Sequence, residues 1–133
     1  MAVDLPLGYQ PSADEEFMNP KQVEYFRQRL EEARTDLEKE LDAMRPRDAD
    51  NLGRDGDQTD HASADSEREF EIQNRERVQM LLRQTERALA RLENGTYGYC
   101  ADTGEPIDLK RLTAQPATSL SLAAQEARER RSG

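Results

Sequence analysis

Two narrow apolar stripes, separated by one acidic loop, constrain this chain more than any other feature. In residues 20–46 and 62–94, apolar side chains recur at alternating intervals of three and four residues, the period of a helix that packs against another helix. The first stripe is Val23, Phe26, Leu30, Ala33, Leu37, Leu41 and Met44, and the second is Val78, Leu81, Thr85, Ala88 and Leu92. Neither stripe is wide enough to stabilise its helix alone. The pattern therefore predicts a long antiparallel two-helix coiled coil.

Local signals predict where each helix begins and ends. Asn19 is a good N-terminal cap, the proline after it is tolerated in a first turn, and Gln22 occupies a capping-box position. Pro46 ends the first helix. The second helix is expected to begin near residues 60–63 and to stop at Gly95, a residue type that commonly follows a helix. These signals agree with the limits of the two stripes.

The composition favours a mainly helical fold without a large globular core. Only 35% of the 133 residues are hydrophobic and another 35% are charged, which suits long helices with narrow apolar seams. We expect an N-terminal arm at residues 1–18, a coiled-coil hairpin at 19–94 with an acidic tip at 47–65, and a C-terminal module at 95–133. Within this module the glycines and prolines predict a compact knuckle at residues 95–116, followed by a terminal helix at 117–131.

The charge of the chain is uneven and argues against nucleic acid as a partner. The net charge is −9, whereas a protein that binds DNA broadly needs a basic surface, so no direct sequence-specific DNA binding is expected. Residues 47–69 contain eight acidic residues and three arginines, and residues 75–91 contain five arginines and two glutamates. Solvated helix faces explain this distribution as well as a charged partner does.

The chain offers few residues for catalysis or metal binding. Its only cysteine is Cys100 and its only histidine is His61, which belong to opposite ends of the predicted hairpin. A cysteine–histidine pair is therefore not expected. The sequence has no phosphate-binding glycine loop, and a closed zinc site needs four ligands, mostly nitrogen or sulfur. We expect no enzymatic activity, no bound cofactor and no zinc.

The sequence also lacks signals for export or membrane insertion. Its N-terminus has no basic start followed by an apolar run, and no stretch approaches the ~20 apolar residues of a membrane span. A single cysteine can form no internal disulfide. A cytoplasmic protein with no membrane contact is expected. Because the chain can pair its own two helices, we also expect a monomer.

The acidic tip is the remaining candidate for a functional site. Asp57 and Asp60 are three residues apart, and Ala62 follows them. Paired carboxylates at a protruding end can bind a hard cation such as Mg²⁺, or they can compete for basic side chains of a partner. Taken by itself, the spacing favours a third interpretation, a soluble loop rich in turn-forming aspartates.

Several segments together resemble the DksA/TraR family of bacterial transcription regulators, over about residues 15–131. The matching segments are Asn-Pro-Lys-Gln-Val-Glu-Tyr-Phe-Arg-Gln-Arg-Leu (19–30), Asp57-x-x-Asp60-x-Ala62, Gln-Asn-Arg-Glu-Arg (73–77), Gly-Thr-Tyr-Gly-Tyr-Cys-Ala-Asp-Thr-Gly (95–104), Ile107, Arg111-Leu112 and Pro116. The resemblance implies a non-enzymatic regulator that inserts its hairpin into the secondary channel of RNA polymerase. The tip aspartates would lie near the catalytic centre and destabilise open promoter complexes, often together with ppGpp in the stringent response.

The chain departs from the family at the metal site. The four-cysteine pattern of the family falls on Cys100, Thr103, Ser121 and Ala124, of which only the first is a cysteine. Zinc supplies on the order of 10 kcal/mol of apparent folding free energy in small fingers. Hydrogen bonds from Thr103 and Ser121, packing of Ala124 and docking on the hairpin are expected to replace it. The departure indicates a zinc-free branch with a degenerate zinc finger.

A second departure concerns ppGpp. The positions of basic residues that help to bind ppGpp in related proteins correspond here to Gln84, Gln115 and Gln125. Glutamine cannot make the charge-assisted bonds that lysine or arginine makes to phosphate, so a weak ppGpp response is expected. The resemblance leaves Asn74, Arg77, Arg87 and Arg111 as expected contacts to polymerase or ppGpp.

Two alternatives remain open from the sequence. A Gre-like transcript-cleavage accessory factor would use the tip carboxylates to recruit Mg²⁺ and water for the nuclease activity of the polymerase. An inert coiled-coil adaptor would carry an acidic loop with no role of its own. The first alternative predicts shortened transcripts, and the second predicts that tip substitutions have no effect.

Overall fold

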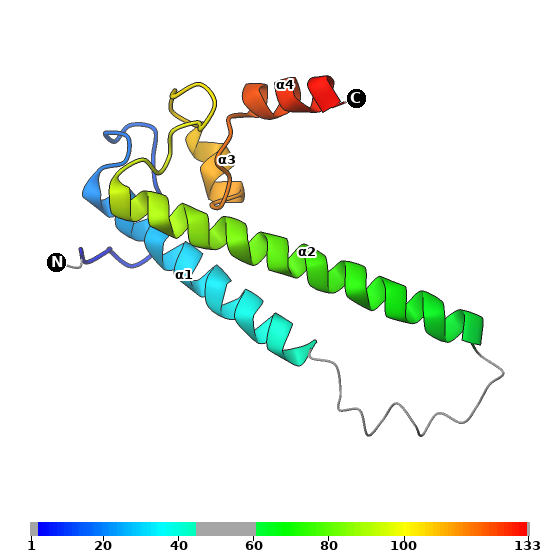
Figure 1. Cartoon of the computed structure of the whole chain (residues 1–133). Helices are drawn as coiled ribbons and strands as arrows, with labels where there is room; N and C mark the ends of the chain where they lie inside the picture. The colour runs from blue at the N-terminus through cyan, green and yellow to red at the C-terminus, as the bar shows by residue number, and fades with distance from the viewer. Residues whose placement is uncertain (1–2, 45–60, 133) are drawn as a thin grey trace.

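The prediction of a mainly helical chain is confirmed. The computed structural model describes residues 3–44 and 61–132, with side chains described from residue 64 onward in the second stretch. The described residues form four helices, which are α1 (Pro20–Ala43), α2 (His61–Asn94), α3 (Leu109–Ala114) and α4 (Leu122–Ser132). α1 and α2 lie antiparallel, side by side, as a long hairpin (Figure 1). We call the end where α1 begins and α2 ends the hairpin base.

The start of α1 follows the predicted cap with one difference. The Asn19 backbone is extended, and its side-chain oxygen accepts a hydrogen bond from the backbone N–H of Gln22 at 3.0 Å. In a capping box the Gln22 side chain would accept from the N–H of Asn19. It instead accepts from the N–H of Met18 at 2.8 Å and is completely buried. Gln22 therefore ties α1 to the N-terminal arm.

The first helix ends earlier than Pro46, the predicted stop. α1 ends at Ala43, and the N–H of Met44 lies 3.2 Å from the carbonyl oxygen of Glu40 and 3.1 Å from that of Leu41. This shared bond tightens the last turn. A residue that precedes a proline disfavours helical backbone, and Arg45 is such a residue. With 34 residues, α2 is much longer than α1, which has 24.

The apolar seam between α1 and α2 is deeper near the hairpin base than away from it. Its buried members are Phe26, Leu30, Val78, Ala88 and Leu92, together with the polar Thr85. The Thr85 hydroxyl donates to the carbonyl oxygen of Leu81 at 2.8 Å, so its polar group is satisfied within the helix. The prediction was wrong at Leu81 itself, which is 37% exposed. Residues 64–73 of α2 are all exposed, so this part of the helix contributes no buried side chain.

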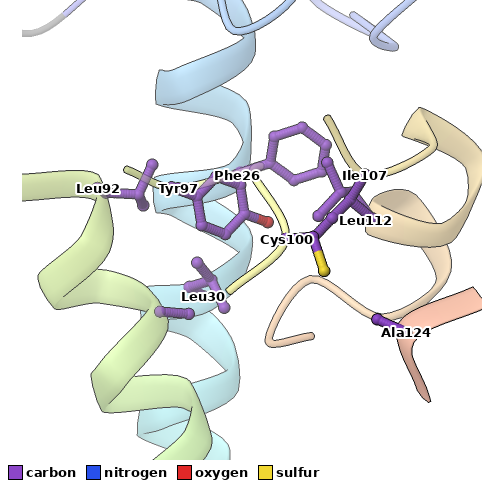
Figure 2. Packing of buried hydrophobic residues seen from close by; sticks show 9 residues of the cluster. Phe26, Leu30, Leu92, Tyr97, Cys100, Ile107, Leu112 and Ala124 are labelled. Carbon is purple, nitrogen blue, oxygen red and sulfur yellow. The ribbon is translucent and has the colours of Figure 1, made fainter. Parts of the chain in front are cut away.

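The main hydrophobic cluster lies at the hairpin base and joins the hairpin to the C-terminal module. Its members are Phe26, Leu30, Ala88, Leu92, Tyr97, Cys100, Ile107, Leu112 and Ala124 (Figure 2). The sequence did not predict α3, which contributes Leu112 and begins at the capping residue Asp108. The terminal helix begins at Leu122, later than the predicted residue 117. Residues 118–120 instead bond to the knuckle, since Ala101 N–H donates to Ser119 O and Arg111 donates to Leu120 O.

The N-terminal arm is packed against the hairpin base. The ring of Phe17 lies edge-on to that of Tyr99, with 5.5 Å between centroids, and Tyr9 lies edge-on to Tyr25 at 6.0 Å. Gly98 has a φ of +93°, and a Cβ added there would lie 3.0 Å from Cγ of Met18. Glycine is therefore required both by the backbone conformation and by the close approach of the arm. None of the described helices is long and apolar enough to cross a membrane.

Candidate functional site

The predicted tip residues fall largely outside the described part of the chain. Asp57 and Asp60 lie outside it, and Ala62 lies in the first turn of α2 with its side chain undescribed. The ends of α1 and α2 that flank the tip are far from the hydrophobic cluster at the hairpin base (Figure 1). The role of the tip therefore stays a prediction.

The outward faces of α2 carry opposite charges in its two halves. The half that follows the tip presents four exposed acids and one exposed arginine, which are Asp65, Glu67, Glu69, Glu71 and Arg68. The half that leads to the hairpin base presents three exposed arginines and two exposed glutamates, which are Arg77, Arg83, Arg87, Glu86 and Glu93. The helix thus offers a partner an acidic surface near the tip and a basic surface nearer the base.

The four predicted contact residues do not form one cluster. Arg77 Nη2 donates to Asn74 Oδ1 at 3.0 Å, so these two residues form a pair one turn apart on α2. Arg87 is exposed further along the same helix. Arg111 is different because its guanidinium is bonded within the fold. Its Nε donates to Leu120 O at 2.8 Å, and its Nη2 donates to the side-chain oxygens of Thr118 and Gln125. Arg77 and Arg87 are therefore the more accessible cations.

The four positions predicted to correspond to the family's metal site lie at the junction of the knuckle and α4. Cys100 is only 2% exposed. Its sulfur accepts a hydrogen bond from Ser121 N–H at 3.4 Å. The Ser121 hydroxyl oxygen accepts from Ala124 N–H at 3.1 Å and so caps the start of α4. Thr103 Oγ1 accepts from Glu105 N–H at 3.2 Å, and Ala124 is buried. These contacts occupy the two hydroxyl groups with backbone partners.

This set of residues does not fit zinc. It offers one thiol, two hydroxyl groups and one methyl group, whereas a structural zinc site uses four sulfur, nitrogen or carboxylate ligands. Within the described ranges no group of three or more histidine, cysteine, aspartate or glutamate residues could hold a metal ion. The contacts that the structure shows at this junction are hydrogen bonds and packing.

The Cys100 thiol has an unusual environment for a cysteine without a metal. Burial by itself raises the pKa of a thiol, but hydrogen bonds from the Ser121 N–H, the Thr103 side chain and the Ser121 hydroxyl outweigh this effect. Together they lower the pKa of Cys100 from 9.0 to about 6. The knuckle therefore stabilises a thiolate at this position, although the sulfur is screened from solvent.

An ion pair that the sequence analysis missed also lies at this junction. Arg128 of α4 donates two hydrogen bonds to the carboxylate of Asp102, from Nε at 2.7 Å and from Nη2 at 2.5 Å. The hydrogen bonds from Arg128 hold the pKa of Asp102 below its ordinary value. Arg128 has no role in the sequence analysis. Its pairing across 26 positions has no local signal in the sequence.

Comparison with known proteins identifies the family. A model described as "DnaK suppressor protein DksA, N-terminal domain" matches residues 22–92, and one described as "Prokaryotic dksA/traR C4-type zinc finger" matches residues 95–130. A protein from Caulobacter vibrioides (strain NA1000 / CB15N), named RNA polymerase-binding transcription factor DksA, is 41% identical over 123 residues, covering 92% of this chain and 87% of the relative. The chain belongs to the DksA/TraR family.

Other members of the DksA/TraR family support this assignment. A protein of the same name from Escherichia coli (strain K12) is 33% identical over 114 residues, covering 86% of this chain and 76% of the relative. The solved structure of transcription factor DksA2 from Pseudomonas aeruginosa has a TM-score of 0.76 and 35% identity, covering 92% of this chain and 93% of that chain. These relatives are named as transcription factors and not as enzymes. The matched zinc-finger model is of the C4 type, yet this chain has one cysteine.

Proposed function

We propose that this protein binds RNA polymerase and regulates transcription, without catalysing a reaction itself. The observation that carries the proposal is its 41% identity, over 92% of the chain, to a protein named for RNA polymerase binding. The long hairpin and the structural similarity to DksA2 support the same function. A cytoplasmic location follows from this partner.

The hairpin is long enough to reach deep into a narrow channel. At 1.5 Å per residue, the 34 residues of α2 extend about 50 Å. Because the hydrophobic cluster lies at the hairpin base, the base can dock outside a channel while the tip extends into it. We propose that the hairpin enters the secondary channel of the polymerase and destabilises open promoter complexes.

The tip aspartates are proposed to act through their charge. Near a catalytic Mg²⁺ and basic active-site residues, a carboxylate in a partly desolvated site interacts more strongly than it would in water. The substitutions Asp57→Asn and Asp60→Asn remove this charge while keeping the shape of the side chain. Both variants are expected to bind core polymerase with nearly unchanged affinity and to lose the ability to shorten open-complex lifetime.

A matched control is Asp36→Asn, which removes an exposed acid of α1 outside the acidic tip at residues 47–65. This variant is expected to regulate like the parent protein. If both tip variants regulate as well as the parent, the tip proposal is wrong and the chain fits the inert adaptor. A stalled elongation complex with labelled RNA tests the Gre-like alternative, because only that alternative predicts shortened transcripts.

We also propose that the C-terminal module folds without zinc. The support is the donor set at the four family positions, which does not suit the metal, and the backbone bonds of Thr103 and Ser121. A chelator is expected to leave the melting temperature unchanged. Elemental analysis of protein purified without a metal-binding tag would overturn the proposal if it found about one zinc per chain.

The response to ppGpp is proposed to be weak. Gln84 is exposed on α2 and lacks the positive charge that phosphate recognition favours. Gln125 is engaged within the fold, since its side-chain oxygen accepts from Arg111 and its nitrogen donates to Glu129. The residues best placed to compensate are Arg77 and Arg87, because Arg111 is occupied by internal acceptors.

A further inference from the structure

The last helix depends on few contacts for its position. Of the 11 residues of α4, only Ala124 is buried. A helix of this length is marginal in water without tertiary contacts. In the four-cysteine members of the family, the metal positions are spread over two elements. The first two correspond to Cys100 and Thr103 in the knuckle, and the last two to Ser121 and Ala124 at the start of α4.

Side-chain hydrogen bonds join the same two elements, the knuckle and α4, in this chain. Arg111 of the knuckle bonds to the segment that leads into α4 and to Gln125 in its first turn. Arg128 of α4 reaches back to Asp102 of the knuckle through two hydrogen bonds. Two parallel hydrogen bonds between a guanidinium and a carboxylate are among the strongest and most directional contacts in proteins.

The ion pair has the position expected of a replacement for the metal. Asp102 lies between the two knuckle positions of the degenerate site, Cys100 and Thr103. Arg128 lies four residues after Ala124, one helical turn further along α4. The Asp102–Arg128 pair therefore joins the two elements that a metal would join, displaced by one turn. The Arg111 contact holds only the segment before α4 and its first turn.

We infer that the Asp102–Arg128 ion pair is the metal substitute of this chain, which positions α4 on the knuckle by charge and geometry instead of by thiolate ligands. The inference rests on the proposed zinc-free fold. If this ion pair holds α4 on the knuckle, a chelator does not affect the docking of α4, whereas added salt weakens it. The pair is partly exposed, with 27% of the Asp102 side chain and 54% of the Arg128 side chain accessible, so added ions can screen it.

Hydrogen–deuterium exchange of the full chain tests this inference. Peptides that cover residues 122–132 report on α4, and peptides that cover residues 78–92 report on the hairpin. Asp102→Asn and Arg128→Gln are each expected to raise exchange in α4 by about threefold, within the range measured for exposed ion pairs. Exchange in the hairpin is expected to stay unchanged. The double variant should exchange no faster than either single variant, because the two substitutions remove one interaction.

Two controls separate the ion pair from a general loss of charge. Glu105→Gln removes an exposed acid of the knuckle, and Arg130→Gln removes an exposed arginine of α4. Neither is expected to alter exchange in α4. The charge reversal Asp102→Arg with Arg128→Asp should restore much of the protection lost in the single variants. Raising the salt concentration should increase exchange of α4 in the parent and not in the double variant.

The outcomes distinguish this inference from the zinc-free proposal. If Asp102→Asn exchanges like the parent and like Glu105→Gln, the ion pair does not position α4 and the inference is wrong. If a chelator frees α4 and zinc is found in the purified protein, the zinc-free proposal itself fails. If hairpin exchange also rises in Asp102→Asn, the residue supports the whole fold and not α4 in particular, which also overturns the inference.

Discussion

Replacement of Gln22 by methionine should destabilise the attachment of the N-terminal arm. The Gln22 side chain is completely buried, where a polar group is costly unless it is bonded. Its oxygen accepts from Met18 N–H at 2.8 Å, and its nitrogen donates to Ser12 O at 3.3 Å and to Glu15 Oε1 at 3.2 Å. Methionine has a similar volume and keeps the packing, but it can make none of these bonds.

The magnitude follows from the three lost bonds. A hydrogen bond within a protein contributes about 1 kcal/mol net, so their loss would cost roughly 3 kcal/mol. Ser12, Glu15 and Met18 are only partly buried, and water can replace some of their bonds. We therefore expect Gln22→Met to lower the free energy of unfolding by about 2 kcal/mol. For a domain of this size, that loss lowers the melting temperature by about 8 °C.

Urea and thermal unfolding would measure this loss, and hydrogen exchange would locate it in residues 12–22. Gln28→Met is a matched control, because Gln28 lies on the exposed face of α1 and bonds to Glu24 at 3.0 Å. The control is expected to cost less than about 0.5 kcal/mol. A Gln22→Met variant as stable as the control would refute the reasoning, since it would mean that the buried amide contributes nothing beyond its volume.

Three further predictions concern the seam, the thiol and the alarmone. Val78→Ala should cost about 2 kcal/mol in urea unfolding, because Val78 is completely buried, whereas Leu81→Ala should cost less, since Leu81 is 37% exposed. The ultraviolet absorbance of the Cys100 thiolate should half-titrate near pH 6. The pKa of Cys100 is lower in the folded chain than its ordinary value of 9.0. The thiolate therefore contributes fully to stability above pH 9.0, and this contribution disappears as the pH falls through about 6. Cys100→Ser should remove this pH dependence of stability. Inhibition of a ribosomal promoter should respond weakly to a ppGpp titration with a polymerase that lacks other ppGpp sites, and Gln84→Lys should strengthen it; a strong response of the parent protein would contradict the prediction.

The hairpin could be predicted from the sequence because its signals are periodic and local. The alternating spacing of apolar residues identified both helices, and Asn19 identified the start of the first. The seam was less accurate in detail. Leu81 has the right spacing, but a stripe only approximates the contact line between two helices, and Leu81 lies at its border. The end of α1 was misplaced because a proline marks the last point that a helix can reach, and α1 ends at Ala43, before Pro46.

The C-terminal module was harder to predict because its structure depends on contacts between distant residues. Nothing near residues 117–121 reveals that their backbone bonds to the knuckle, as Ser119 O does with Ala101 N–H. The short helix α3 has only six residues, too few for a periodic pattern. The hydrogen-bond partners of Gln22 and of Asp102 could likewise not be predicted, because the tertiary fold determines which groups meet these side chains.

The distribution of burial along the hairpin bears on how the proposed function can be tested. The hydrophobic cluster lies at the hairpin base, and the α2 residues from 64 to 73 are all exposed. Substitutions of buried seam residues, such as Val78→Ala, are therefore expected to change stability and regulation together. Exchanging a carboxylate for an amide at an exposed site usually changes stability by less than about 0.5 kcal/mol. The control variant Asp36→Asn meets that condition. If Asp60→Asn melts like this control and still loses regulation, the loss reflects charge at the tip and not an unfolded hairpin.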